Sequence, residues 1–433
     1  MAKLKNRHSG RLIDVWVPGN SGNNPKSFHW IKKLFGLVLL IGIFIFLTSM
    51  WNYFDFSLNN STPSSNLNEY FTSASAIGKP EKVIWSVSTG SDPLSVPPFS
   101  DGENVYVITG QQPSTCKIVA LNISNGSLIW ERNLYSVADH EPVAAGNLIF
   151  VAVRTGELLA LNKNTGEIEW SFNSESLIRG SPVVLNGVLY LAASKVHAFD
   201  AMLGELLWEH QVGNDVSQQV TISGEVLGII SADGHINLVD ISNGKRRMTF
   251  RLPFGNTKFP KSNSDTVVLA GMKSNVIAID LNEKDVPMEK AIRAWWRVLW
   301  KLDLANRPPV PRGFQWWQRS LKGFSAHTLG IDDRFAFINV RDPGNRSRLV
   351  ALDVSDGSPV WANQFDSDLT QGAILRAGAI IVATEYGDIH KFSMDTGREL
   401  WKFKHDSELG VSPVASDDGL IVADKDGRIT AFR

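Results

Sequence analysis

The sequence predicts an all-β fold: an eight-bladed β-propeller of four-stranded antiparallel blades, preceded by one transmembrane helix. Three observations support it: a strand–turn–strand pattern that recurs about every 40 residues, a tryptophan at a fixed place in most copies, and a long uncharged run near the N-terminus. The 433-residue chain is 43% hydrophobic and 20% charged, a globular composition. We expect, in chain order, a basic segment (1–33), a transmembrane signal anchor (34–54), a Ser/Asn-rich linker (55–80) and the propeller (81–433).

The membrane anchor is predicted from residues 34–54, which carry no charged side chain. A helix of this length, rising about 1.5 Å per residue, spans about 31 Å and so can cross a bilayer. Trp30 before the run, and Trp51 and Tyr53 at its end, are aromatic residues where the membrane interfaces are expected.

The orientation of the anchor is predicted from the basic segment that precedes it. Residues 1–33 contain seven Lys and Arg against one acidic residue, Asp14, a net charge of +6 (7 − 1). Positive flanks stay in the cytoplasm, so we expect a cytoplasmic N-terminus and an extracytoplasmic body. A cleaved signal peptide is the alternative, but it needs small residues close behind the apolar run, and the nearest suitable site is at residues 73–76.

The repeat consists of an Ala, a Gly six residues later and a Trp four residues after that. Full copies are Ala120-Gly126-Trp130, Ala160-Gly166-Trp170, Ala198-Gly204-Trp208 and Ala351-Gly357-Trp361, and degenerate copies are Leu238-Gly244-Met248 and Lys391-Gly397-Trp401. Each Ala lies in an apolar strand, the Gly allows a turn with positive φ, and the Trp lies in the next strand. With two strands upstream, each copy makes a blade whose Trp is expected to pack into the seam with its neighbour.

Eight positions are predicted to carry these blade-docking side chains. They are Trp85, Trp130, Trp170, Trp208, Met248, Trp300, Trp361 and Trp401. Trp85 has no blade before it, and the last strand, at residues 430–433, has no Trp after it. The N-terminal strand is therefore expected to complete the last blade and close the ring, which removes exposed sheet edges.

The Ala-x5-Gly-x3-Trp frame, over about residues 82–433, resembles the tryptophan-docking repeat of pyrroloquinoline-quinone (PQQ)-type β-propellers. In architecture the chain is most similar to the BamB-like, non-catalytic propellers. That resemblance implies an eight-bladed periplasmic protein that binds its partner through loops during outer-membrane β-barrel assembly. BamB-like proteins are lipoproteins, whereas this chain carries a predicted transmembrane helix.

The quinoprotein alcohol dehydrogenases are the alternative within this resemblance. They hold PQQ and calcium against a disulfide between adjacent cysteines, and this chain has a single cysteine, Cys116. The sequence also lacks a Gly-x-Ser-x-Gly elbow, a phosphate-binding loop and a His-Glu-x-x-His motif. We therefore expect no enzyme activity, no cofactor, no metal and no catalytic residue. His197 and His390, at equivalent repeat positions, are interpreted as strand residues.

Two further ligand classes were considered. The net charge of −1 gives no support for nucleic-acid binding. The central channel could bind a small ligand through polar residues on the innermost strands, although propeller channels are polar in general. The candidates are His140-Glu141-Pro142, Gly180-Ser181-Pro182, Gln218-Gln219, Ala326-His327 and Gln371-Gly372.

An insertion at about residues 281–324 interrupts the repeat. Between Lys284 and Lys322 it holds nine basic and three acidic residues, a net charge of +6 (9 − 3). A helix is predicted from Pro287 to Val298, with one apolar face formed by Ala291, Ala294, Trp295 and Val298. Candidate contacts to a partner or a membrane are Arg293, Trp295, Trp296, Arg297, Trp316 and Trp317. The alternative is a structural plug of the channel or of a blade edge.

The sequence thus predicts a single-pass protein of the cytoplasmic (inner) membrane whose propeller is extracytoplasmic, and periplasmic in a cell with two membranes. Its predicted function is that of a scaffold for protein–protein interaction, in cell-envelope or outer-membrane protein assembly, with a protein partner of the envelope. The alternatives are a PQQ-dependent oxidoreductase and a propeller that binds a ligand at its channel mouth.

Overall fold

The computed structural model describes residues 2–5, 12–15, 76–90, 94, 96–211, 216, 220–252, 258–283, 288–306, 313–416 and 419–433. These fall into two compact units, one drawn from residues 1–62 and 286–308 and the other from 63–285 and 309–433. The predicted anchor at 34–54 lies outside the described residues. No helix within them has both the length and the apolar character needed to span a bilayer.

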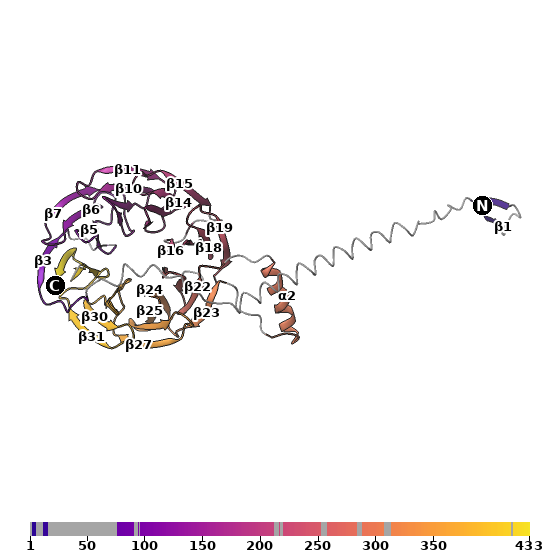
Figure 1. Cartoon of the computed structure of the whole chain (residues 1–433). Helices are drawn as coiled ribbons and strands as arrows, with labels where there is room; N and C mark the ends of the chain where they lie inside the picture. The colour runs from indigo at the N-terminus through magenta and orange to yellow at the C-terminus, as the bar shows by residue number, and fades with distance from the viewer. Residues whose placement is uncertain are drawn as a thin grey trace. The chain divides into compact units, whose positions relative to one another are not determined.

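The described residues of the first unit form a two-stranded antiparallel ribbon and one helix. The ribbon pairs β1 (Ala2–Lys5) with β2 (Leu12–Val15), and the helix is α2 (Glu289–Lys301). The second unit consists of eight four-stranded antiparallel sheets that follow one another around a ring (Figure 1). This confirms the predicted eight-bladed propeller.

The first four blades follow the chain without interruption. They are β4–β7 (Phe99–Ser100, Asn104–Thr109, Lys117–Asn122, Leu128–Asn133), β8–β11 (Val143–Ala145, Leu148–Ala152, Glu157–Asn162, Ile168–Asn173), β12–β15 (Val183–Leu185, Val188–Ala192, Lys195–Asp200, Leu206–Gln211) and β16–β19 (Thr221–Ser223, Val226–Ile230, His235–Asp240, Arg246–Arg251).

The other four blades include the one with the insertion and the one that closes the ring. They are β20–β23 (Lys258–Ser262, Thr266–Ala270, Asn275–Asp280, Phe314–Ser320), β24–β27 (Ser325–Ile331, Phe335–Asp342, Arg346–Asp353, Pro359–Phe365), β28–β31 (Ile374–Arg376, Ala379–Ala383, Asp388–Ser393, Glu399–Lys404) and β32–β34 (Val414–Ala415, Leu420–Ala423, Arg428–Phe432) with β3 (Val83–Ser88).

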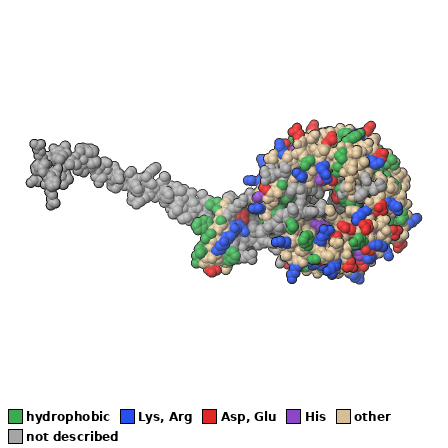
Figure 2. All heavy atoms as spheres, turned by 180° about the vertical axis from the view of Figure 1, so that it is seen from behind, with side chains coloured by type: hydrophobic (Ala, Val, Ile, Leu, Met, Phe, Trp, Pro, Cys, Tyr) green, Lys and Arg blue, Asp and Glu red, His purple; other side chains and the backbone are tan. Residues whose placement is uncertain are grey.

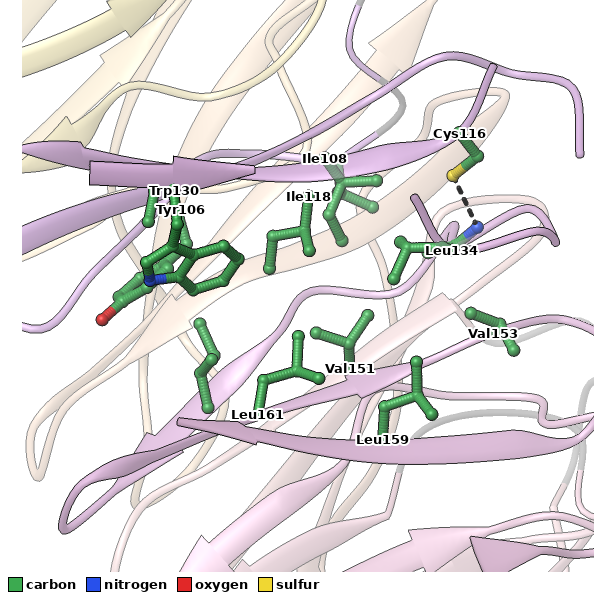
Figure 3. Packing of buried hydrophobic residues seen from close by; sticks show 14 residues of the cluster. Tyr106, Ile108, Cys116, Ile118, Trp130, Leu134, Val151, Val153, Leu159 and Leu161 are labelled. Atoms are coloured by element: carbon green, nitrogen blue, oxygen red, sulfur yellow. Dashed lines mark hydrogen bonds between the residues drawn. The ribbon is translucent and has the colours of Figure 1, made fainter. Parts of the chain in front are cut away.

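The core lies between blades. The two middle strands of a blade are covered by neighbours on both faces, so they are continuously apolar, as in β9 (LIFVA), where every residue is buried. Figure 3 shows one such seam, where Tyr106 and Trp130 of the first blade lie over Val151 and Leu161 of the second. The Sγ atom of Cys116 accepts a hydrogen bond from the backbone N–H of Ala138 at 3.4 Å, and burial raises the pKa of this thiol.

Five of the predicted docking tryptophans pack on the glycine turn of the next blade: Trp85, Trp130, Trp170, Trp208 and Trp361. Trp130 donates its indole N–H to the carbonyl of Lys163 at 2.7 Å, and its ring lies against Gly166. Gly166 has φ 73°, and a Cβ atom there would lie 2.6 Å from the ring, so both the turn and the docking require glycine. The same bond joins Trp85 to Ile123, Trp170 to Ala201, Trp208 to Ile241 and Trp361 to Met394.

Gly166→Ala is expected to lower the midpoint of thermal unfolding clearly more than Gly187→Ala. Both glycines have similar positive φ values, 73° and 78°, but a Cβ atom at Gly187 meets nothing within 4 Å. The Gly187 variant therefore isolates the backbone cost of about 1–2 kcal/mol, and the Gly166 variant adds about 1–3 kcal/mol for the clash with Trp130. Equal midpoints for the two variants would contradict the docking role of the turn.

The blade with the insertion has a different residue at the docking position from the one expected. Ala278 of β22 pairs in register with Trp316 of β23, as Ala120 pairs with Trp130. Trp300, predicted for this position, lies in α2 with 41% of its surface exposed, so that prediction was wrong. The physical reason is that the insertion falls between the two outer strands of the blade. The number of residues after Ala278 therefore no longer indicates which residue of β23 pairs with it. The insertion returns to the sheet at Phe314, not near residue 324.

The insertion replaces the glycine turn of the fifth blade. In the first blade the backbone N–H of Asn122 donates to the carbonyl of Ser127, and in the fifth that of Asp280 donates to Gly313. The residues between Asp280 and Gly313 thus take the place of a short turn. The preceding blade carries Met248 at its docking position, 4% exposed, where no glycine turn faces it.

The predicted ring closure is confirmed. β3 pairs with β34, placing Trp85 opposite Ala431, and the backbone N–H groups of Glu81 and Lys82 both donate to the carbonyl of Arg433 at 3.0 Å. Figure 1 shows the C-terminus beside β3. Because these two strands are not joined by a turn, the eighth blade lacks the usual acceptor, and the buried Nε1 of Trp401 has no hydrogen-bond partner among the described residues.

The chain just before β3 is also fixed to the ring. Ile77 is 2% exposed and packs with Leu409, Leu420 and Phe432 between the last two blades. Lys391, which has the place of Ala in the frame of the seventh blade, donates its Nζ to the carbonyl of Ile77 at 2.7 Å. Burial lowers the pKa of this ammonium.

Candidate interaction surface

Two surfaces of the described chain stand out as sites for binding another molecule. The first is the α2 segment, defined as residues 288–306. The helix begins after Met288, whose φ is 64°, two residues later than the predicted start at Pro287, and it ends at Lys301, three residues beyond Val298. Glu289 in its first turn and Lys301 in its last suit the helix dipole.

The end of the α2 segment is folded back toward the helix. The half-buried Trp296 donates its indole N–H to the carbonyl of Asn306 at 2.9 Å. The backbone N–H of Leu304 donates to the carbonyl of Leu299 at 2.9 Å. Helix and following turn therefore form one local structure, which holds the side chains after Lys301 near the last turns of the helix.

The apolar face predicted for this helix is exposed. Trp295, Val298, Leu299 and Leu302 follow the i, i+3, i+4, i+7 spacing of one helix face and are 65%, 49%, 40% and 62% exposed. Leu304, in the turn that follows, is 72% exposed.

A row of basic residues runs beside the apolar face. Arg293, Arg297 and Lys301 recur at steps of four residues, which places them along one side of the helix, and Lys290 extends the same spacing in the sequence. Figure 2 shows hydrophobic and basic side chains gathered on this segment. The α2 segment is thus amphipathic, with Lys and Arg on one side and Trp, Val and Leu on the other.

The six contact residues predicted from the sequence do not lie in one element. Arg293, Trp295, Trp296 and Arg297 lie in α2, whereas Trp316 and Trp317 lie in β23, a strand of the fifth blade. Leu299, Leu302 and Leu304 were not among the predicted contact residues. The first two continue the spacing that identified Trp295 and Val298, so the signal was present but was not extended past Val298.

The second surface is one face of the propeller, here called the loop face. It carries the turns between the second and third strands of each blade and the loops that lead to the next blade. Backbone bonds join these turns and loops, from Leu134 to Cys116 and from Lys273 to Phe324, each at 3.0 Å. Five large side chains on it are exposed: Tyr135 (82%), Phe324 (68%), Tyr386 (53%), Met272 (53%) and Leu177 (47%).

Ion pairs also lie on the loop face. Arg154 pairs with Asp139 at 2.5 Å and Lys425 with Glu408 at 2.9 Å, each joining a turn to a loop. The Glu408 carboxylate raises the pKa of the Lys425 ammonium. Exposed aromatic residues are enriched in protein interfaces relative to the rest of the surface. This surface could not be predicted from the sequence, because single loop residues have no periodicity.

Other exposed apolar residues belong to the repeat itself. They recur at the start of the outer strands, just before the docking position: Val83, Ile84, Leu128, Ile129, Ile168, Leu206, Leu207, Val360 and Leu400. Since this pattern returns from blade to blade, it distinguishes no part of the ring.

The polar residues considered for the channel mouth bond mainly between blades. His140 contacts the carbonyl of Ile178 at 3.1 Å, and the backbone N–H of Glu141 donates to Ser181 at 2.9 Å. The backbone N–H of Gly372 donates to Ser412 at 2.6 Å. Gln218 and Gln219 lie outside the described residues. These contacts join the innermost strands to one another and give no support for a ligand site.

Comparison with known proteins identifies the family. The family model described as outer membrane protein assembly factor BamB matches residues 117–300 and 345–433, more than half of the chain. The chain belongs to the BamB family. The interruption of the match, residues 301–344, covers the end of the insertion and the return of the chain to the fifth blade.

Individual relatives of this BamB-family propeller are distant. Outer membrane protein assembly factor BamB of Moranella endobia is 22% identical over 270 residues, which are 55% of this chain and 67% of that protein. The crystal structure of BamB from Moraxella catarrhalis superposes with a TM-score of 0.57 at 14% identity, covering 81% of this chain and 97% of that one. Quinohemoprotein alcohol dehydrogenase from Comamonas testosteroni gives 0.58 at 12% identity, covering 81% and 76%. Both structures therefore share the propeller fold of this chain.

The dehydrogenase likeness raises the question of whether this BamB-family chain could hold PQQ and calcium. The described residues contain no group of three or more His, Cys, Asp or Glu side chains placed to hold a metal. The single cysteine, Cys116, is buried in a seam. His197 stacks on Phe199, and His390 lies 2.6 Å from Glu399 and stacks on Phe392. The described part of the chain does not fit a quinone–metal site.

Proposed function

We propose that this protein is a non-enzymatic, membrane-anchored scaffold that binds a protein partner during outer-membrane protein assembly. The observation that carries the proposal is the BamB family match, which extends over most blades of the ring. The exposed loop face supports it, because a binding scaffold needs a surface that its own packing leaves open.

The anchoring is proposed from residues 34–54 and from the +6 charge before them. With this anchor, the protein is held in the cytoplasmic membrane with its N-terminus in the cytoplasm and its propeller in the periplasm. In intact spheroplasts, external protease is then expected to cut beyond residue 55 and to spare the N-terminal segment. A soluble mature form without the apolar run would contradict the anchor.

The partner surface is tested by photo-crosslinking in membranes. Benzoylphenylalanine is placed at Tyr135 or at Phe324 of the full chain, on the loop face. The matched control is Leu203, which is 66% exposed in the turn between β14 and β15, at the opposite edge of its blade. We expect a discrete protein adduct from both loop-face positions and none from Leu203.

Two results would contradict the scaffold proposal. One is equal crosslinking from both faces, or none from the loop face, in cells that express the protein at its natural level. The other is stoichiometric PQQ in the purified protein together with dye-linked alcohol oxidation, which would assign it to the dehydrogenases.

A further inference from the structure

The α2 segment has a surface that neither the repeat nor the proposed scaffold role requires. Trp295, Val298, Leu299, Leu302 and Leu304 leave large apolar side chains exposed within ten consecutive residues. The exposed apolar residues of the outer strands belong to the blade repeat, whereas these five residues lie outside it. A continuous exposed apolar face of this kind marks a contact with another surface.

The basic row indicates which kind of surface it is. Residues 34–433 carry a net charge of −7, since the whole chain carries −1 and residues 1–33 carry +6. Four cationic residues along one helix in an acidic body are therefore a local feature. A helix with Lys and Arg on one face and Trp and aliphatic residues on the other is the composition of helices that lie in a membrane interface.

The local hydrogen bonds suit this position. The indole N–H of Trp296 and the backbone N–H of Leu304 both have acceptors within the segment, at 2.9 Å each. Leu302 and Leu304 can thus enter an apolar layer without exposing these donors to it. The 13-residue helix is about 20 Å long at 1.5 Å per residue, too short to span a bilayer but long enough to lie along its surface.

We propose that the α2 segment is a membrane-surface element that lies flat on a bilayer rich in anionic phospholipid. Trp295, Val298, Leu299 and Leu302 enter the boundary between headgroups and acyl chains, while Arg297 and Lys301 pair with the lipid phosphates. This contact is additional to the proposed anchor. Two points of attachment on one chain bind the membrane more tightly than either does alone.

The test uses full-length protein in nanodiscs of phosphatidylcholine, with or without phosphatidylglycerol. Val298→Cys is labelled with a nitrobenzoxadiazole fluorophore, and since the native Cys116 is only 1% exposed, the label is confined to the new site. The matched control is the same label at Leu203→Cys. We expect blue-shifted emission and quenching by nitroxide lipids at Val298→Cys only, and only with phosphatidylglycerol.

A charge variant tests the basic row separately. The triple change Lys290→Glu, Arg297→Glu, Lys301→Glu is expected to lower the ratio of immersed to aqueous label by roughly 100-fold at low salt, at about fivefold per cation. The control triple is Lys82→Glu, Lys245→Glu, Lys322→Glu, at exposed positions of the propeller unit, and it should leave the ratio unchanged. High salt should reproduce the loss by screening.

Three results would overturn the proposal. They are equal immersion with and without phosphatidylglycerol, a label that remains aqueous in both discs, and a label that is shielded from water in both discs but is not quenched by nitroxide lipids. The last would show that another part of the chain, a second copy or a bound protein covers the face. If the chain fails to enter nanodiscs, the proposed anchor fails, and flotation of the labelled protein with preformed phosphatidylglycerol vesicles decides the role of α2 independently.

Discussion

Deleting residues 82–87 is expected to open the ring and to cause the largest loss of stability of any change considered. The deletion removes nearly all of β3, so that β34 loses its partner and exposes an unpaired edge. It also removes Trp85, which is 7% exposed and donates to the carbonyl of Ile123 in the next blade. Loss of a buried Trp alone costs about 3–5 kcal/mol.

The measurement is the midpoint and the cooperativity of thermal unfolding of the full chain. Trp85→Ala should reproduce most of the fall in the unfolding midpoint that the deletion causes. Val83→Ala should change the free energy of unfolding by less than about 0.5 kcal/mol. Val83 lies on the same strand but is 50% exposed. An unchanged melting curve for the deletion would show that β3 does not close the ring.

Trp130→Ala and Trp300→Ala are expected to differ strongly, although both replace a Trp that the sequence assigns to blade docking. Trp130 is 8% exposed and packs against Gly166, so its truncation should cost about 3–5 kcal/mol. Trp300 lies on α2 and is 41% exposed, so its truncation should cost less than about 0.5 kcal/mol.

Chemical denaturation of the two variants beside the wild type provides the comparison. A large fall in the free energy of unfolding for Trp300→Ala would indicate that Trp300 occupies the docking position. It would contradict the register of Ala278 with Trp316. A small fall in the free energy of unfolding for Trp130→Ala would contradict the docking of its indole ring on the next blade. Phe172→Ala, an exchange in the neighbouring seam, serves as a control for loss of aromatic packing without an indole N–H.

The fold was predictable because each blade repeats the same physical solution. The turn needs Gly for its positive φ, and the same Gly leaves room for the Trp ring, so the two residues recur together at a constant spacing. Closure by the N-terminal strand could be predicted too. The Trp85 strand has no blade before it, and the strand at 430–433 has no Trp-bearing strand after it, so the two strands complete one blade. The Trp300 assignment failed because it relied on spacing where the insertion separates β22 from β23.

The candidate surfaces were predictable only in part. Helical periodicity identified the apolar side of α2 correctly, but periodicity shows which residues share a face and not whether something covers it. The exposure of Trp295 and Leu302 became known only from the structure. The loop face depends on antiparallel topology, which brings Tyr135, Phe324 and Tyr386 to one edge although they are far apart in the sequence.

The attachment of Ile77 has a mechanical consequence. With the proposed N-terminal anchor, any pull from a bound partner passes through the segment before the propeller, and the first propeller strand on that path is β3, which closes the ring. Tension must first extract Ile77 from between the last two blades and break its bond to Lys391 before it can peel β3 from β34. The strand pair that closes the propeller is therefore shielded from load by a short clamp placed just ahead of it.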